Sequence, residues 1–231
     1  TGDSATVTGV VSGTFASANK GDGRAVTANL SQLSLSNTNY YLSGVTTALT
    51  ANITAAPILI GGLSASNKTY NRDNVAVLTG TPVIASGLLG SDSATLSGTA
   101  TAGTFASLNA GNGIAVTPTL TDLSLNNSNY TIAGIDTALT ANITPANLVI
   151  TATTDAKFVT QSDLVGSANN CGVGIACAGG YMGVTYNGFV NGENKDVLQG
   201  SPVVIRTNDT VDAAGVYVGV LKASGHTASN Y

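Results

Sequence analysis

One long segment of the sequence occurs twice. Residues 12–60 align with residues 102–150 without a gap, at an offset of 90, and more than half of the aligned residues are identical. The longest shared run, TALTANIT, occupies residues 47–54 and again residues 137–144. Such self-similarity limits the chain to folds in which a small module recurs in tandem. We call residues 12–60 the first copy and residues 102–150 the second copy.

Within each copy, apolar and polar residues alternate. Leu49, Ala51 and Ile53 fall on one side of an extended strand, with polar residues between them. Leu33 and Leu35 follow the same pattern. The alternation predicts β-strands with one buried face, and residues 53–57 and 143–147 are predicted to be stiff, proline-containing joints that end a strand ladder.

Glycines and aromatic residues recur at fixed places in the two copies. Gly21-Asp22-Gly23 and its counterpart Gly111-Asn112-Gly113 are predicted to be tight turns with a glycine at positive φ. The aromatic residues are predicted to anchor the core, and the alternative is an aromatic platform for a ligand; they are Phe15, Phe105, Tyr40 and Tyr130.

Composition supports an all-β fold. Only 9% of the residues are charged and Glu193 is the sole glutamate, so strong helix formers are scarce while Thr and Val are abundant. A disordered low-complexity chain is the alternative, but disorder usually accompanies low hydrophobicity, and 43% of these residues are hydrophobic. Aliphatic runs are too short to span a membrane, so we expect no direct membrane insertion, with any signal peptide outside this sequence.

The third segment, residues 151–231, has a similar plan without matching in detail. Residues 188–193 resemble a strand that enters a turn, and the alternation in residues 214–220 predicts a strand with Val216, Val218 and Val220 on one face. We therefore predict three domains: a partial module at 1–60, a complete module at 61–150 and a divergent module at 151–231 that lacks its last strand. The modules are expected to stack end to end into an elongated rod.

The two cysteines lie close together in a glycine-rich stretch. Cys171 and Cys177 are separated by five residues, which suits a small disulfide loop in a secreted protein, and a reduced pair of small core residues is the alternative. Tyr181 and Met182 lie in the same stretch, residues 166–183. This loop is a candidate binding site for a glycan or a host protein, and an idle surface loop is the alternative.

No pattern in the sequence indicates catalysis. One histidine, His226, and one glutamate leave little capacity for acid–base chemistry, so we expect no enzyme activity and no catalytic residues. No spacing suits a metal or cofactor, and Asp22 as a weak calcium ligand is less favoured than a turn role because its counterpart is Asn112. A net charge of −4 without a basic cluster argues against a nucleic-acid partner.

Sequons of the form Asn-x-Ser/Thr offer candidate glycosylation sites. A chain this rich in Asn and Thr produces several by chance, so they carry meaning only in a host that glycosylates. The candidate sites are Asn29, Asn52, Asn67, Asn126, Asn142 and Asn208.

Several short motifs resemble known repeat families. Residues 67–72 followed by Val77-Leu78-Thr79-Gly80 resemble the opening of a YDG repeat, with Tyr-Asp-Gly altered to Tyr70-Asn71-Arg72, and residues 141–146 resemble its exit. Residues 187–193 and 214–217 resemble an MBG (mostly beta-grasp) repeat. Such repeats occur in large exported proteins similar to filamentous-haemagglutinin-like and HMW-type adhesins of Gram-negative bacteria. The resemblance implies a β-grasp-like fold, a location on the outer bacterial surface and a stalk role, and HMW-type adhesins can be glycosylated at sequons.

The repeat and the resemblance lead to three functional hypotheses. The first is a structural stalk or spacer in a surface adhesin or fibre, whose partners are neighbouring repeats. The second is a subunit of an extracellular filament, in which identical chains complete each other by strand addition because the chain begins and ends within modules. The third is a module that binds a host glycan or surface protein through residues 166–183.

Overall fold

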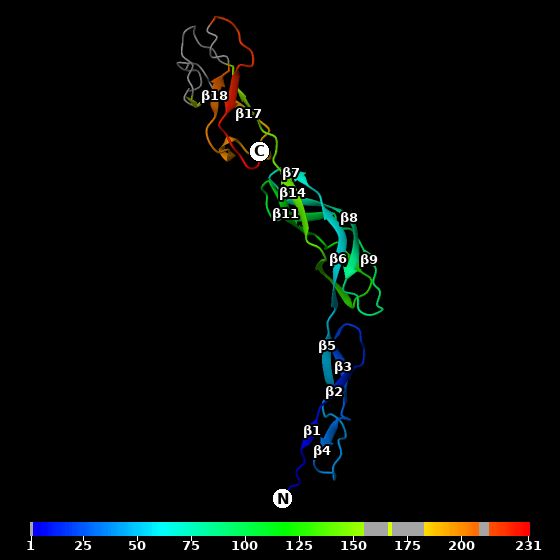
Figure 1. The fold of residues 1–231 in the computed structure, drawn as a ribbon. Helices are drawn as coiled ribbons and strands as arrows, with labels where there is room; N and C mark the ends of the chain where they lie inside the picture. The colour runs from blue at the N-terminus through cyan, green and yellow to red at the C-terminus, as the bar shows by residue number, and fades with distance from the viewer. Residues whose placement is uncertain (1, 155–165, 168–182, 208–212) are drawn as a thin grey trace. The chain divides into compact units, whose positions relative to one another are not determined.

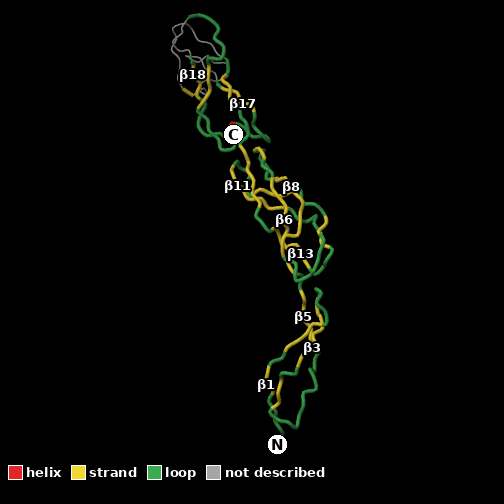
Figure 2. The backbone as a smooth tube through the Cα atoms, turned by 45° about the vertical axis from the view of Figure 1, so that its right-hand side comes forward, coloured by secondary structure: helices red, strands yellow, loops and turns green. Residues whose placement is uncertain are grey.

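The computed structural model describes residues 2–154, 166–167, 183–207 and 213–231 (Figure 1). Strands dominate this part of the chain, and the one helical element within it is the 3-10 helix η1, Lys195–Val197. Figure 2 shows short strands alternating with loops along the described backbone. The all-β prediction is therefore confirmed. None of the described helical residues forms a segment with the length and apolarity needed to cross a membrane.

The chain folds into two compact units. Unit 1 comprises Thr1–Leu63, Gly80–Ala100 and Leu120–Thr137, and unit 2 comprises Ser64–Thr79, Thr101–Thr119 and Ala138–Tyr231. Strands β6 (Ala56–Ala65) and β8 (Val75–Ser86) each contribute residues to both units. The second copy is therefore divided between the units, while the first copy lies within unit 1.

Unit 1 contains the strands of the first copy and part of the second. They are β1 (Val7–Gly9), β2 (Ser12–Phe15), β3 (Gly21–Asn29), β4 (Leu33–Leu35), β5 (Leu49–Ile53), β9 (Leu96–Ser97), β12 (Ser124–Leu125) and β13 (Tyr130–Ile135). β2, β3 and β5 form a three-stranded antiparallel sheet, β1 pairs with β4, and β9 pairs with β12. β13 runs parallel to the first residues of β6.

Unit 2 contains the rest of the second copy and the third segment. Its strands are β7 (Lys68–Thr69), β10 (Ala102–Phe105), β11 (Gly111–Pro118), β14 (Leu139–Thr144), β15 (Val149–Ala152), β16 (Gly166–Ser167), β17 (Val184–Asn187), β18 (Val203–Arg206) and β19 (Leu221–Ser224). β10, β11 and β14 repeat the arrangement of β2, β3 and β5. β8 pairs antiparallel with β10, and β7 pairs parallel with β14. In the third segment, β15 pairs with β17, and β16, β18 and β19 form a separate sheet.

The strand pattern predicted for residues 137–144 is confirmed in the second copy. Leu139, Ala141 and Ile143 are buried, and the polar residues between them face outward. Phe105 and Tyr130 are also buried, as predicted for core anchors. In unit 1, Tyr130 packs with Ile58, Ile60, Ala100 and Leu123 to form the core.

The identical residues of the first copy are exposed. Phe15 is 41% exposed where Phe105 is 2% exposed, and Tyr40 is 50% exposed where Tyr130 is 5% exposed. The core-anchor prediction is therefore wrong for Phe15 and Tyr40. The physical reason is that, among the described residues, no counterparts of β6, β7 and β8 cover the first copy.

The Gly-x-Gly motifs are β-bulges and not hairpin turns. Gly23 and Gly113 have φ values of 58° and 62°, which confirms the predicted positive φ. Both motifs nevertheless lie at the start of long strands, β3 and β11, where the pairing register shifts between Gly21 and Arg24 and between Gly111 and Ile114. One extra residue in one strand is the mark of a bulge, and glycine fits it because the bulged backbone is left-handed.

Two further predictions are wrong, one about a proline and one about a strand. Pro57 does not end a ladder: it is the second residue of β6 and pairs in register with Thr131. Residues 213–220 form bends and turns without a strand, and Val216 and Val218 are almost fully exposed. The strand next to them begins only at Leu221. Alternation alone did not identify a buried face, because these two valines lie exposed among the described residues.

Candidate functional site: the joints between repeats

Asn129 links the second copy to the first. Its Oδ1 accepts a hydrogen bond from the backbone N–H of Lys20 at 2.9 Å, and its Nδ2 donates to Oδ1 of Asn19 at 2.9 Å. Its carbonyl oxygen accepts from the backbone N–H of Ala56 at 2.8 Å. One side chain and its own peptide group thus connect a loop and a strand of the preceding copy.

Asn230 makes the same contacts between the third segment and the second copy. Its Oδ1 accepts from the N–H of Ala110 at 2.9 Å, its Nδ2 donates to Oδ1 of Asn109 at 3.1 Å, and its carbonyl accepts from the N–H of Ala146 at 2.8 Å. These three partners lie 90 residues after Lys20, Asn19 and Ala56. The chain therefore contains one joint twice, although the third segment differs in sequence from the copies.

An Asx turn presents the joint asparagine. The N–H of Asn129 donates to Oδ1 of Asn127 at 3.0 Å, and the N–H of Tyr130 donates to the carbonyl of Asn127 at 3.2 Å. Asn side chains favour such turns because they mimic a backbone acceptor. The turn holds the side chain of Asn129 outward, toward the neighbouring copy, and directs Tyr130 into the core.

The tyrosine that follows each joint asparagine is held by a carboxylate. Tyr130 donates to Asp92 at 2.7 Å and accepts from the N–H of Leu89 at 3.1 Å. Tyr231 donates to Glu193 and accepts from the N–H of Val190 at 3.0 Å. A hydrogen bond to Asp92 raises the pKa of Tyr130, because ionisation would place two negative charges side by side. These contacts fix the backbone that carries Asn129 and Asn230.

Around Glu193, the second joint has an additional cluster. Tyr70 donates to Glu193 at 2.8 Å, and Nε of Arg72 lies 3.8 Å from the same carboxylate. The rings of Tyr70 and Phe189 pack edge-on against Tyr231 at centroid distances of 5.7 and 5.4 Å. Burial, followed by the hydrogen bond to Glu193, raises the pKa of both Tyr70 and Tyr231. The only glutamate of the sequence is therefore a structural acceptor at the joint.

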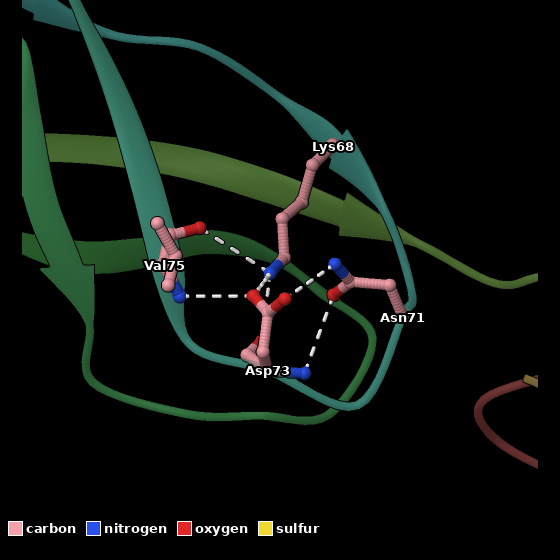
Figure 3. Close-up of polar contacts among 4 residues, drawn as sticks. All are labelled: Lys68, Asn71, Asp73 and Val75. Atoms are coloured by element: carbon pink, nitrogen blue, oxygen red, sulfur yellow. Dashed lines mark hydrogen bonds and ion pairs between the residues drawn. The ribbon is translucent and has the colours of Figure 1, made fainter. Parts of the chain in front are cut away.

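The turn that leads to Tyr70 and Arg72 is held by a lysine (Figure 3). Nζ of Lys68 lies 2.6 Å from Oδ1 of Asp73 and donates to the carbonyls of Asp73 and Val75. Asn71 donates to the other carboxylate oxygen of Asp73 at 2.7 Å. The hydrogen bond from Lys68 lowers the pKa of Asp73. The amine of Lys68 thus binds one carboxylate and two backbone carbonyls, and these contacts hold the turn in place.

A shallow hollow lies at the same place in both copies. In the second copy it has a volume of about 490 Å³ and is lined by residues that include Leu123, Leu125 and Tyr130. In the first copy it has a volume of about 640 Å³ and is lined by the equivalent Leu33, Leu35 and Tyr40. The hollow is open, and no charged residue lines it in either copy, so it offers no reactive group.

His226 has a structural environment. Its Nε2 lies 2.7 Å from the hydroxyl of Tyr186, and its Nδ1 lies 3.3 Å from the carbonyl of Gln199. A carbonyl oxygen only accepts, so Nδ1 is the donor in the second contact. Burial raises the pKa of Tyr186. Within the described residues, no three His, Cys, Asp or Glu side chains are grouped closely enough to hold a metal ion.

Five of the candidate glycosylation sites lie within the described residues, and their side chains make hydrogen bonds. Oδ1 of Asn52 accepts from Gly23 and Oδ1 of Asn142 accepts from Gly113, both at 2.8 Å, so these side chains hold the two bulges. Oδ1 of Asn67, Asn126 and Asn29 accepts from the N–H of Asn142, Thr95 and Ser31, respectively. Each bond uses Oδ1, whereas a glycan would attach to Nδ2, so glycosylation stays an untested prediction.

Several candidate residues lie outside the described residues. They are Cys171, Cys177, Tyr181, Met182 and Asn208. The disulfide, the binding loop and the sequon at Asn208 therefore stay predictions.

Comparison with known proteins supports one of the resemblances. Residues 54–141 match the family model of the YDG domain. The YDG match begins before β6 and ends within β14, so it contains β7, β8 and the joint residue Asn129. No curated protein and no solved structure matches the chain.

The altered YDG signature has a structural explanation. In Tyr70-Asn71-Arg72, Arg72 occupies the position of the signature glycine and has φ 64°, in the left-handed region that glycine adopts most readily. The side chain of Arg72 donates to the carbonyl of Asn191 at 3.1 Å and approaches Glu193. Unlike a glycine, Arg72 therefore contacts the third segment.

Sequence reasoning did not assign a role to the joint asparagines. The signal was present, because Asn-Tyr occurs at residues 39–40, 129–130 and 230–231. In each pair the tyrosine has the more obvious role, because an aromatic ring is typical of a core residue. An amide side chain beside a buried tyrosine gives no local clue that its partner lies more than a hundred residues away.

Proposed function

We propose that the chain is part of a stalk or spacer in a cell-surface or secreted bacterial adhesin or fibre. The observation that carries this proposal is the recurrence of one joint at Asn129 and Asn230, with three equivalent hydrogen bonds each. A joint that is repeated in detail sets each module in the same relation to the one before it. Regular addition of modules is what a spacer needs and what a flexible linker does not provide.

Further support comes from the chemistry of the conspicuous polar groups. Glu193 and His226 are both engaged in structural hydrogen bonds, and Lys68 is paired with Asp73. A non-enzymatic role without cofactors is in keeping with these contacts. The resemblance to YDG and MBG repeats supports three further parts of the proposal. These are the extracellular location, the β-grasp classification and the link to Gram-negative haemagglutinin-like and HMW-type adhesins.

Small-angle X-ray scattering on the chain tests the stalk proposal. Modules joined in a row give a radius of gyration well above the ~17 Å expected for a compact domain of this length. A double variant, Asn129→Ala with Asn230→Ala, should broaden the distance distribution because both joints lose their side-chain bonds. Circular dichroism of both proteins controls for unfolding. A radius of gyration near the compact value would contradict the stalk.

A second candidate function is a filament subunit that joins identical chains by strand addition. The observation that favours it is the exposed sheet of the first copy, whose outer strands β2 and β5 each pair only with β3 among the described strands. Sedimentation at increasing concentration distinguishes the two: a filament subunit assembles, whereas a spacer stays monomeric. Binding of a host glycan or protein through residues 166–183 stays a hypothesis, and a glycan array with and without that loop would test it.

A further inference from the structure

The first and second copies provide an internal comparison of one sequence in two environments. In the second copy, β10 pairs with β8, β14 pairs with β7, and β13 pairs with β6. All three partner strands come from one continuous segment, residues 56–86. In the first copy, the equivalent positions in β2, β5 and residues 40–45 have no such partners within the described chain.

The exposed surface matches the area that this segment covers in the second copy. Leu49 is 41% exposed where Leu139 is 8% exposed, and Phe15 differs from Phe105 in the same way. Residues 40–45 form no strand, although their counterparts form β13, and Tyr41 and Val45 are more than half exposed. Open strand edges beside exposed apolar side chains form a template for strand addition.

The surface is already arranged to receive a partner. Asn39 lies in an Asx turn equivalent to that of Asn129. Its N–H donates to Oδ1 of Asn37 at 3.0 Å, as the N–H of Asn129 does to Asn127. Tyr40 donates to Asp3 at 3.1 Å, as Tyr130 does to Asp92. The sheet register is also the same, since Phe15 faces Val26 as Phe105 faces Val116. The paired strands and the turn therefore need little reorganisation before binding, which limits its entropic cost, whereas residues 40–45 must still become a strand.

We propose that β2, β5 and residues 39–45 form a docking surface for the opening segment of a further repeat of the same type. The occupant resembles residues 56–86 in sequence. Its strand like β6 would pair with residues 40–45, its strand like β8 with β2, and its short strand like β7 with β5. Residues 56–86 of a second copy of this chain are not the occupant, because they already pair with β10, β13 and β14. This inference concerns a binding surface and holds whether or not the chain is a stalk.

The amide of Phe15 is the sharpest probe of the docking surface. In the second copy, the N–H of Phe105 donates to the carbonyl of Asn74, next to β8, at 2.8 Å. The N–H of Phe15 is its counterpart at the open edge of β2. Amide hydrogen exchange at Phe15 therefore reports whether a strand has been added.

The test joins a second copy of residues 54–90 directly in front of Gly2 of the full chain. We expect exchange of the Phe15 amide to slow by at least about ten-fold, since an exposed edge becomes a paired one. Two controls have the same added length: a Gly/Ser segment, and the added copy with Ile58→Asp and Ile60→Asp. Neither control should protect Phe15.

Two results would overturn the proposal. The first is unchanged exchange at Phe15 in the fusion while the Phe105 amide stays protected, which shows that the rest of the chain is folded. The second is protection of Phe15 in the original chain that rises with protein concentration, because that result assigns the surface to a second copy of the chain. A synthetic peptide of residues 54–90, added in excess to the original chain, repeats the test without a covalent link and should also slow exchange at Phe15.

Discussion

At the scale of single residues, a few polar side chains determine how the modules join. Asn129 and Asn230 each bind a backbone N–H and an asparagine of the preceding copy, and each precedes a tyrosine held by a carboxylate. The amide side chain suits this position because it donates and accepts at once, so it satisfies two groups of the neighbouring loop.

Replacement of Asn129 should weaken the first joint specifically. Asn129→Ala removes two side-chain hydrogen bonds, which together contribute roughly 1–3 kcal/mol. We expect faster hydrogen exchange at the Lys20 amide, which donates to Asn129. Asn39→Ala is the matched control, since Asn39 lies in the same turn without these partners among the described residues. Equal effects of the two variants on Lys20 would contradict the assigned joint.

The tyrosines around Glu193 predict a loss of stability in alkali. Their pKa values are raised in the folded chain above the ordinary value of 10.0. Above pH 10 the unfolded chain therefore holds fewer protons than the folded chain, and stability falls as pH rises toward the raised values. At neutral pH this stabilising contribution is fully present.

Tyr70→Phe separates this contribution from general alkaline effects. The variant loses the hydrogen bond to Glu193, which costs roughly 1.5–3 kcal/mol because the acceptor is charged, and its stability should fall less steeply above pH 10. Urea denaturation at neutral pH and just above pH 10 measures both effects. Tyr41→Phe, at an exposed tyrosine, should change neither. An unchanged slope in Tyr70→Phe would show that Tyr70 does not titrate with folding.

At the scale of strands, the two copies show how much local sequence determines. Residues 137–144 and 47–54 are identical, and both form the predicted strand, yet only Leu139, Ala141 and Ile143 of the second copy are buried. Alternation predicted which face is apolar, but burial depends on whether β8 and β7 cover that face. The same limit explains Val216 and Val218, which follow the alternating pattern and are nevertheless almost fully exposed.

The backbone geometry at the Gly-x-Gly motifs could be predicted only in part. The glycine patterns indicated positive φ at Gly23 and Gly113, while the distinction between a turn and a bulge depends on the register against β5 and β14. Asn52 and Asn142 stabilise these bulges, and neither contact could be predicted from residues 29 positions apart.

Equal substitutions in the two copies should have unequal costs. Phe105→Ala removes a buried ring and should destabilise the second copy by about 3–5 kcal/mol. Phe15→Ala removes a ring that is already largely exposed and should cost less than about 1.5 kcal/mol. Urea denaturation followed by tyrosine fluorescence, with hydrogen exchange to assign the affected copy, measures the difference. Similar costs would mean that the ring of Phe15 is also buried in solution.

At the scale of the whole molecule, the internal repeat predicts more of the fold than the amino-acid composition does. The repeat indicated a tandem all-β chain, and its opening motif indicated the YDG domain that matches residues 54–141. The compact units nevertheless do not coincide with the repeats, because β6 and β8 each contribute to both units. A module boundary predicted from the repeat marks the residue at which the sequence pattern starts again. A strand can continue through that residue, as β6 does at the predicted boundary between residues 60 and 61.

The central claim is that one joint adds each module in the same way. Its most direct test is scattering from chains that contain one, two or three further copies of residues 61–150 inserted after Ile150, where the junction reproduces the natural step from Ile60 to Gly61. The account predicts that the maximum dimension increases by a constant amount with each inserted copy. An increment that shrinks with each copy, as in a compact particle, would contradict it.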